Sequence, residues 1–143
     1  MNGPLSQALQ SVGIRVCHHP VLVTAPPPSW KAFDAAWLQR QQVDWVGFTS
    51  QRAVRWFSQR LATLGGNLAE LSHCKIACIG PSTAETWVAL GGQLPLVPEV
   101  SHAEALGEAI LQTGIASHCC WLPQALQARE ALGVLLREAG IKI

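Results

Sequence analysis

Short apolar runs and amphipathic stretches alternate along most of this 143-residue chain. Short, mainly apolar runs, as in strands covered by helices on both faces, occur at 45–48, 75–79, 94–97 and 119–122. Before, between and after them, the pattern predicts helices over 30–41, 51–64, 83–90, 101–111 and 127–139. Strands that alternate with helices over short links predict an α/β fold, with a parallel sheet flanked by helices.

The ends of the chain follow a less regular pattern. A helix is expected over 5–12, closed by Gly13, because glycine adopts the left-handed conformation at a helix end without steric cost. A strand is expected over 14–23, and the prolines at 26–28 predict an extended linker, since proline cannot donate a backbone hydrogen bond. The first helix has no strand before it, and the last strand begins at Ile141, so both ends look cut from something longer.

Two predicted strands end in turns that carry hydroxyl groups. Thr49 and Ser50 follow one strand, and Gly80, Ser82 and Thr83 follow the next. In doubly wound sheets, ligands bind beyond the carboxyl ends of the strands, where helices present unpaired N–H groups. These turns therefore favour binding of a carboxylate or phosphate, the alternative being that the hydroxyls only cap helices.

Other polar and aromatic residues have simpler interpretations. Ser101 and Glu104 have the spacing of a capping box, S-x-x-E, at the start of a helix. The five histidines lack a carboxylate or cysteine at catalytic spacing and are expected to be structural or exposed. Trp30, Phe33 and Trp37 lie on one face of a predicted helix, which favours core packing over a ligand-stacking surface.

Composition and charge exclude several classes of function. Ten Lys and Arg against nine Asp and Glu leave a net charge of +1, far from the basic surface that nucleic-acid binding requires. We find no export signal and no apolar run long enough to cross a membrane, and five cysteines, an odd number, fit a reducing cytoplasm without disulfides. No metal site is expected, and the phosphate-binding and nucleophilic-serine motifs G-x-G-x-x-G, G-x-x-x-x-G-K-[ST] and G-x-S-x-G do not occur.

Four segments resemble the uroporphyrinogen-III synthase family. Residues 43–54, VDWVGFTSQRAV, are similar to its strand ending in F-T-S and the A-V pair that opens a helix. Residues 75–84, KIACIGPSTA, are similar to its I-G-P-x-T-A segment, and V-P-E at 97–99 with A-E-A-L at 103–106 is similar to a third. At 122–130, LPQALQARE resembles L-P-R-G-x-x-A-R-x, but Gln124 and Ala125 replace Arg-Gly, so a basic contact is missing at Gln124.

The resemblance implies a domain organisation and an activity. In the family, two α/β domains are joined by a two-stranded linker, so residues 1–28 would be a remnant of the first domain with its Pro-rich linker. Residues 29–143 would be the inserted domain. The implied enzyme cyclises hydroxymethylbilane to uroporphyrinogen III, inverting ring D and releasing water, as a cytoplasmic monomer when complete and without metal or organic cofactor.

The resemblance also assigns roles to the two turns. It implies that Thr49, Ser50, Gly80, Ser82 and Thr83 bind the substrate, and that Thr83 is the catalytic residue. With half of the family's two-domain pattern lacking a counterpart, this chain alone would catalyse little or nothing. The alternatives are a non-catalytic α/β module that binds a small anion or a partner through the same turns, and a scaffold in which the turns are merely capped helices.

Overall fold

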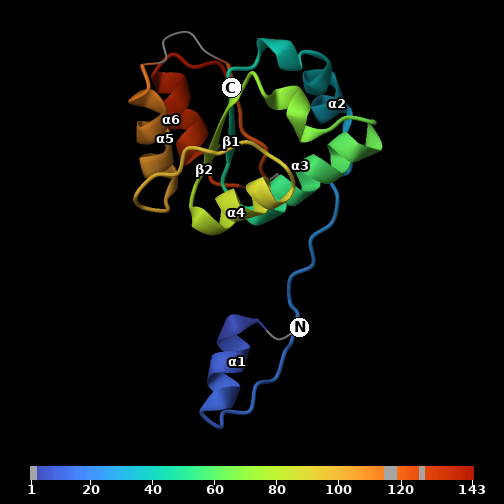
Figure 1. The fold of residues 1–143 in the computed structure, drawn as a ribbon, viewed down its shortest axis with the longest axis vertical. Coiled ribbons are helices and arrows are strands. Elements are labelled where there is room, and N and C mark those ends of the chain that lie inside the picture. The colour runs from blue at the N-terminus through green and yellow to red at the C-terminus, as the bar shows by residue number, and fades with distance from the viewer. Residues whose placement is uncertain (1–2, 115–118, 126–127) are drawn as a thin grey trace.

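The structure is a computed structural model that describes residues 3–114, 119–125 and 128–143. The described residues contain six α-helices, five of which lie around a small sheet. Figure 1 shows the first helix apart from the others, joined to them by an extended segment. The α-helices are α1 (Pro4–Ser11), α2 (Lys31–Leu38), α3 (Gln51–Thr63), α4 (Pro81–Ala89), α5 (Ala103–Leu111) and α6 (Ala131–Glu138). Two 3₁₀ helices, η1 (Arg40–Gln42) and η2 (Leu68–Leu71), precede strands.

The sheet is parallel, with the strand order β2-β1-β3. Its strands are β1 (Trp45–Phe48), β2 (Lys75–Cys78) and β3 (Cys120–Trp121). Single parallel bridges continue it at both edges, since Leu96 pairs with Ala77 of β2 and Lys142 pairs with Cys119. The predicted α/β fold with a parallel sheet flanked by helices is confirmed.

Side-chain alternation along the strands gives the domain two cores. Val46 and Phe48 of β1 face one core, which α2, α3 and α4 cover; Trp45 faces the other, which α5 and α6 cover. Figure 1 shows these two groups of helices on opposite sides of the strands. All four residues of β1 are buried, as expected of a parallel strand with helices on both faces.

Several predicted elements are confirmed and others are not. Glycines that follow the helices have positive φ, 82° at Gly13 and 85° at Gly140, as expected of helix-ending glycines. The strand predicted over 14–23 is wrong for this structure, because no strand among the described residues pairs with the backbone of that segment. Residues 94–97 form only one bridge, and Gln127, where the last helix is predicted to begin, lies outside the described residues.

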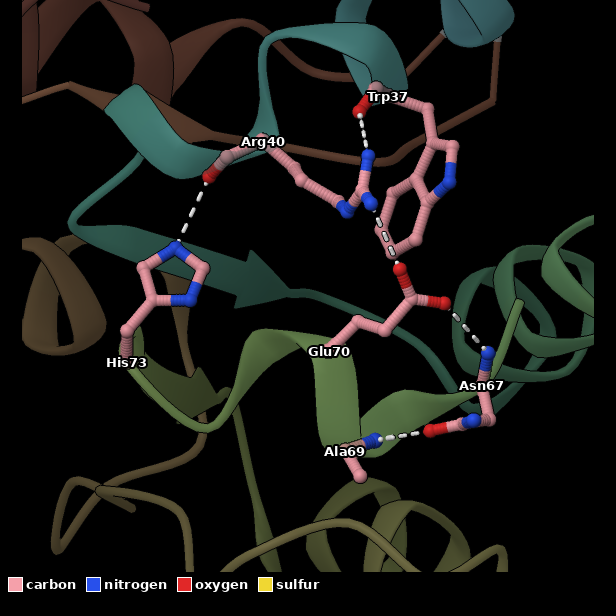
Figure 2. A network of polar contacts seen from close by, with 6 residues as sticks. All are labelled: Trp37, Arg40, Asn67, Ala69, Glu70 and His73. Atoms are coloured by element: carbon pink, nitrogen blue, oxygen red, sulfur yellow. Dashed lines mark hydrogen bonds and ion pairs between the residues drawn. The ribbon is translucent and has the colours of Figure 1, made fainter.

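A polar network joins η1 to η2 at the amino end of the sheet (Figure 2). Arg40 Nη2 lies 2.8 Å from Glu70 Oε2, and Arg40 Nη1 donates to the Trp37 carbonyl over 3.2 Å. Glu70 Oε1 accepts from the Asn67 backbone N–H, which completes a capping box for η2. Because η1 and η2 directly precede β1 and β2, this network holds the entry to both strands, at the end opposite the predicted turns.

Candidate functional site

The carboxyl ends of β1, β2 and β3 lie at the same edge, because all three strands are parallel. Thr49, Gly80 and Pro123 therefore belong to loops at one edge of the sheet. The chain passes from β1 through α3 to β2 on one side, and α5 later brings it to β3 on the other side of β1. The loops after β1 and β3 thus lead away in opposite directions. The space between them is the topological switch point, where doubly wound sheets bind ligands.

A pocket of about 340 Å³ lies at this switch point. Its walls come from the ends of β1 and β2, from the start of α5 and from the segment before α6. The lining residues are Thr49, Ile79, Ser101, His102, Ala103, Glu104, Gln124, Ala128, Arg129, Ala131 and Leu132. We call it the switch-point pocket.

Two helices begin at the switch-point pocket, α5 at Ala103 and α6 at Ala131, and the N–H groups in the first turn of a helix have no partner within the helix itself. At α5, His102 Nδ1 accepts a hydrogen bond from the Ala105 N–H over 3.1 Å. The Glu104 carboxylate lies 3.2 Å from the same nitrogen, an ion pair that would require a proton there. The two contacts therefore exclude each other, because the first needs a lone pair on Nδ1 and the second needs a proton there.

Arg129 supplies a positive charge to this pocket. The residue is exposed, and within the described parts of the chain its guanidinium has no ion pair or hydrogen bond. It precedes α6, whose N-cap residue, Glu130, makes no side-chain capping bond. Guanidinium, hydroxyl and backbone N–H donors thus lie around a pocket large enough for a carboxylate-bearing group.

The two residues of the first predicted turn, Thr49 and Ser50, have different places in the structure. Thr49 is half-buried and lines the switch-point pocket. Ser50 is the N-cap of α3, where its hydroxyl accepts from the Ala53 N–H over 3.1 Å. The capping expected at this turn is confirmed for Ser50, whereas the substrate-binding roles of both residues stay predictions.

The second predicted turn lies beside the pocket without lining it. Gly80 is the N-cap of α4, and a Cβ placed on it would lie 2.5 Å from Ser101 Oγ. The close approach that Gly80 permits is therefore made by Ser101, which also lines the switch-point pocket. Ser82 is exposed, and Thr83 is 3% exposed, with no hydrogen bond to its hydroxyl in the described residues.

Sequence reasoning missed three residues that the fold brings to this pocket: Ser101, His102 and Arg129. The capping box predicted from Ser101 and Glu104 is wrong, because α5 starts one residue later and His102 is its N-cap. Ser101 instead packs against Gly80. Only the LPQALQARE segment, which contains Arg129, offered a signal for this wall.

Buried cysteines offer no nucleophile in this domain. Burial raises the pKa of Cys74 to about 11 and those of Cys78 and Cys120 to about 12. Burial also raises the pKa of Cys119. These thiols are therefore protonated at neutral pH, and within the described residues no group of three His, Cys, Asp or Glu side chains could hold a metal ion.

The strand order and the helices on both faces define a doubly wound α/β domain, and the switch-point pocket lies where such domains bind their ligands. The chain belongs to the family described as uroporphyrinogen-III synthase HemD, which matches residues 3–143. The resemblance seen in the sequence is thereby confirmed. The family implies a small-molecule substrate, and no helix in the described residues is long and apolar enough to cross a membrane.

Two curated relatives support this membership. A uroporphyrinogen-III synthase of Synechococcus elongatus is 33% identical over 107 residues, which cover 75% of this chain and 40% of that protein. A protein of Methanothermobacter thermautotrophicus, provisionally assigned the same function, is 34% identical over 100 residues, covering 70% of this chain and 39% of the relative. The match thus spans about two fifths of the length of these relatives.

Proposed function

We propose that this chain is the part of a uroporphyrinogen-III synthase that holds the acidic side chains of hydroxymethylbilane during ring closure. The observation that carries the proposal is the switch-point pocket, where Thr49 and Arg129 meet the starts of α5 and α6. Acetate and propionate groups match guanidinium, hydroxyl and backbone N–H donors. Family membership supports the choice of a tetrapyrrole over other anions.

The proposed chemistry requires positioning more than covalent catalysis. The hydroxymethyl group of the substrate loses its hydroxyl with a proton, as water, and leaves an electrophilic azafulvene. Ring D attacks this carbon through its substituted position to give a spiro intermediate, which opens and recloses with ring D inverted. The protonated thiols of the buried cysteines fit a reaction without a protein nucleophile, in which fixed donors stabilise developing charge.

In this proposal, both turns contribute to the substrate site. Thr49, Ser50, Gly80, Ser82 and Thr83 bind the substrate, with Thr83 as the catalytic residue. Thr83 is 3% exposed and its hydroxyl has no partner in the described residues, which leaves that hydroxyl available to a ligand or to a water molecule. A hydroxyl can accept one hydrogen bond while it donates another, so it can pass a proton on without keeping a charge.

The organisation implied by the family is also part of the proposal. Residues 1–28 are a remnant of a first domain with its Pro-rich linker, and residues 29–143 are the inserted domain. The complete enzyme works as a cytoplasmic monomer, without cofactor and without nucleic acid. The extended chain between α1 and α2, where Val21 is 88% exposed and Val23 is 89% exposed, supports a linker at this place.

Substitution of Thr83 tests the proposal. Calorimetry with uroporphyrinogen III measures binding by this chain, and a coupled assay for the type III isomer measures turnover in the complete enzyme. Thr83→Val keeps the shape of the side chain and removes the hydroxyl, so we expect at least a tenfold loss of turnover or affinity with no loss of thermal stability. Thr83→Ser, which restores a hydroxyl, is the matched control and should recover most of the loss.

Other outcomes separate the alternatives. Binding of uroporphyrinogen III by this chain, with no type III product even from the complete enzyme, would favour the non-catalytic anion-binding module. If the wild-type chain does not bind uroporphyrinogen III at all, the proposed substrate site is wrong. Variants of Ser50 that lower stability but leave ligand affinity unchanged would reduce that turn to a helix cap.

A further inference from the structure

A second pocket, of about 380 Å³, shares Gln124 with the switch-point pocket. Its walls come from the Pro-rich segment at 25–28, from the start of α2, from the first turns of α3 and from the loop after β3. Figure 1 shows the segment before α2 reaching the body of the molecule close to α3. The aromatic members of the wall are Trp30, Phe33, Trp56 and Phe57. We call it the aromatic pocket.

Half-buried rings form much of this wall. The centroids of Trp30 and Trp56 are 6.3 Å apart with their planes tilted by 45°, and Phe33 meets Trp30 edge to face at 5.6 Å. Such rings offer faces and edges to another flat ring, whose contacts with them are favoured beyond simple apolar burial. The aromatic stripe that the sequence assigns to the core is therefore only partly core, since Trp37 is buried while Trp30 and Phe33 line this pocket.

The charge beside the aromatic pocket is already neutralised. Arg60 lies 5.3 Å from the Trp30 ring, but its guanidinium makes two hydrogen bonds to the Asp34 carboxylate, at 2.9 and 2.6 Å. A ligand carboxylate placed here would lose its water without gaining a free cation in return. A pyrrole ring, which carries one N–H donor and no charge, would lose much less by the same move. The two pockets would therefore bind different parts of a ligand, one its ring and the other its charged side chains.

Resting on the proposed function, we infer that the aromatic pocket receives one pyrrole ring of the tetrapyrrole while carboxylate side chains of the ligand bind in the switch-point pocket. The turn after β1 is attached to both pockets: Thr49 lines one, and Ser50 caps the helix whose Ala53 and Trp56 line the other. Gln124 lies where both meet. A ring with short acidic arms matches this arrangement better than a simple anion, which would leave the aromatic pocket empty.

Binding of small probes to the chain tests this inference. The first probe is a monopyrrole with one acetate and one propionate side chain, and the second is adipate, which carries two carboxylates and no ring. Calorimetry should show the monopyrrole binding roughly tenfold more tightly than adipate, because ring contacts add to carboxylate binding. The monopyrrole should also change tryptophan fluorescence, while adipate should not.

Matched variants locate the two halves of the probe. Trp56→Leu should remove the advantage of the monopyrrole and leave adipate binding unchanged, while Trp56→Phe should keep most of the advantage. Ala53→Leu, which fills the pocket from the same helix, should act like Trp56→Leu. Arg129→Gln should weaken both probes several-fold, and Arg137→Gln, which removes the same charge at the far end of α6, should weaken neither.

Equal affinity of the wild-type chain for monopyrrole and adipate would overturn the inference, as would full monopyrrole affinity in both Trp56→Leu and Ala53→Leu. Uroporphyrinogen III, titrated in parallel, separates this failure from that of the proposed function. If Trp56→Leu binds uroporphyrinogen III as tightly as the wild type, the ring is misplaced and the proposed function stands. If the wild type does not bind uroporphyrinogen III, both are wrong.

Discussion

At the scale of single residues, Asp34 and Arg60 form an ion pair that links α2 to α3 beside the aromatic pocket. The two hydrogen bonds from Arg60 hold the pKa of Asp34 below its ordinary value of 3.8. The same bonds raise the pKa of Arg60 above its ordinary value. Since the guanidinium also lies over the Trp30 ring, this pair positions an aromatic wall as well as joining two helices.

Removal of the Asp34 charge should therefore lower stability in a pH-dependent way. The folded-state pKa lies below the unfolded-state value, so the stabilisation is complete above about pH 3.8 and is lost as the pH falls through the lowered value. Thermal unfolding followed by circular dichroism should show Asp34→Asn melting below the wild type at neutral pH, with the difference vanishing in acid. Glu108→Gln, at an exposed position on α5, should show no such difference. A gap between Asp34→Asn and wild type that persists in strong acid would contradict the assignment.

At the scale of elements, the strands that pair along their whole length were predictable from sequence. Trp45–Phe48 and residues 76–78 are apolar and buried inside the sheet, as their composition indicates. Residues 94–97 are also apolar but lie at a sheet edge, where they form one bridge. Apolar composition alone does not distinguish a central strand from an edge segment.

Only the part of the candidate site formed by the turns after β1 and β2 was predictable from the sequence. Thr49 and Gly80 come directly after strands, and parallel strands place their ends together whatever the strand order is. Ser101, His102 and Arg129 reach the switch-point pocket because β3 pairs on the opposite side of β1 from β2. The side of β1 on which β3 pairs depends on how α5 and α6 pack against the second face of the sheet. No local sequence pattern predicts that packing.

The network between η1 and η2 carries a prediction at this scale. Glu70→Ala removes the ion-pair partner of Arg40 and the acceptor of the Asn67 N–H (Figure 2). Arg40 Nε is already buried without a hydrogen bond in the described residues, so the guanidinium would lose a further partner. We expect a loss of about 2 kcal/mol in the free energy of unfolding, from a broken cap and a part-buried charge left unpaired.

Urea unfolding at constant m-value measures this loss. Glu70→Gln is the matched control, because its side-chain oxygen can still accept from Asn67 or Arg40, and it should lose clearly less. Ligand affinity should not change in either variant, since the network lies at the opposite end of the sheet from the switch-point pocket. Equal stability of Glu70→Ala and wild type would show that η1 and η2 are held by apolar packing alone.

At the scale of the whole molecule, the chain divides into a packed α/β body and a segment with few contacts. Val21, Leu22 and Val23 are 88%, 78% and 89% exposed, and in the part of the chain that the structure describes no strand pairs with their backbone. The sequence predicts a strand over 14–23 because its composition suits one. A strand exists only when another strand supplies its hydrogen bonds, which is a property of the assembled fold and not of the segment.

Two truncations test this division together with the aromatic pocket. A chain that begins at Thr24 should melt within about 2 °C of the full chain, because the removed residues contribute little to either core. It should also bind the monopyrrole with unchanged affinity, since the prolines that line the aromatic pocket remain. A chain that begins at Ser29 should melt at a similar temperature but bind the monopyrrole several-fold more weakly, while its affinity for adipate stays the same. A large fall in melting temperature on removal of residues 1–23 would instead place those residues within the folded body, and the domain boundary near residue 28 would be wrong.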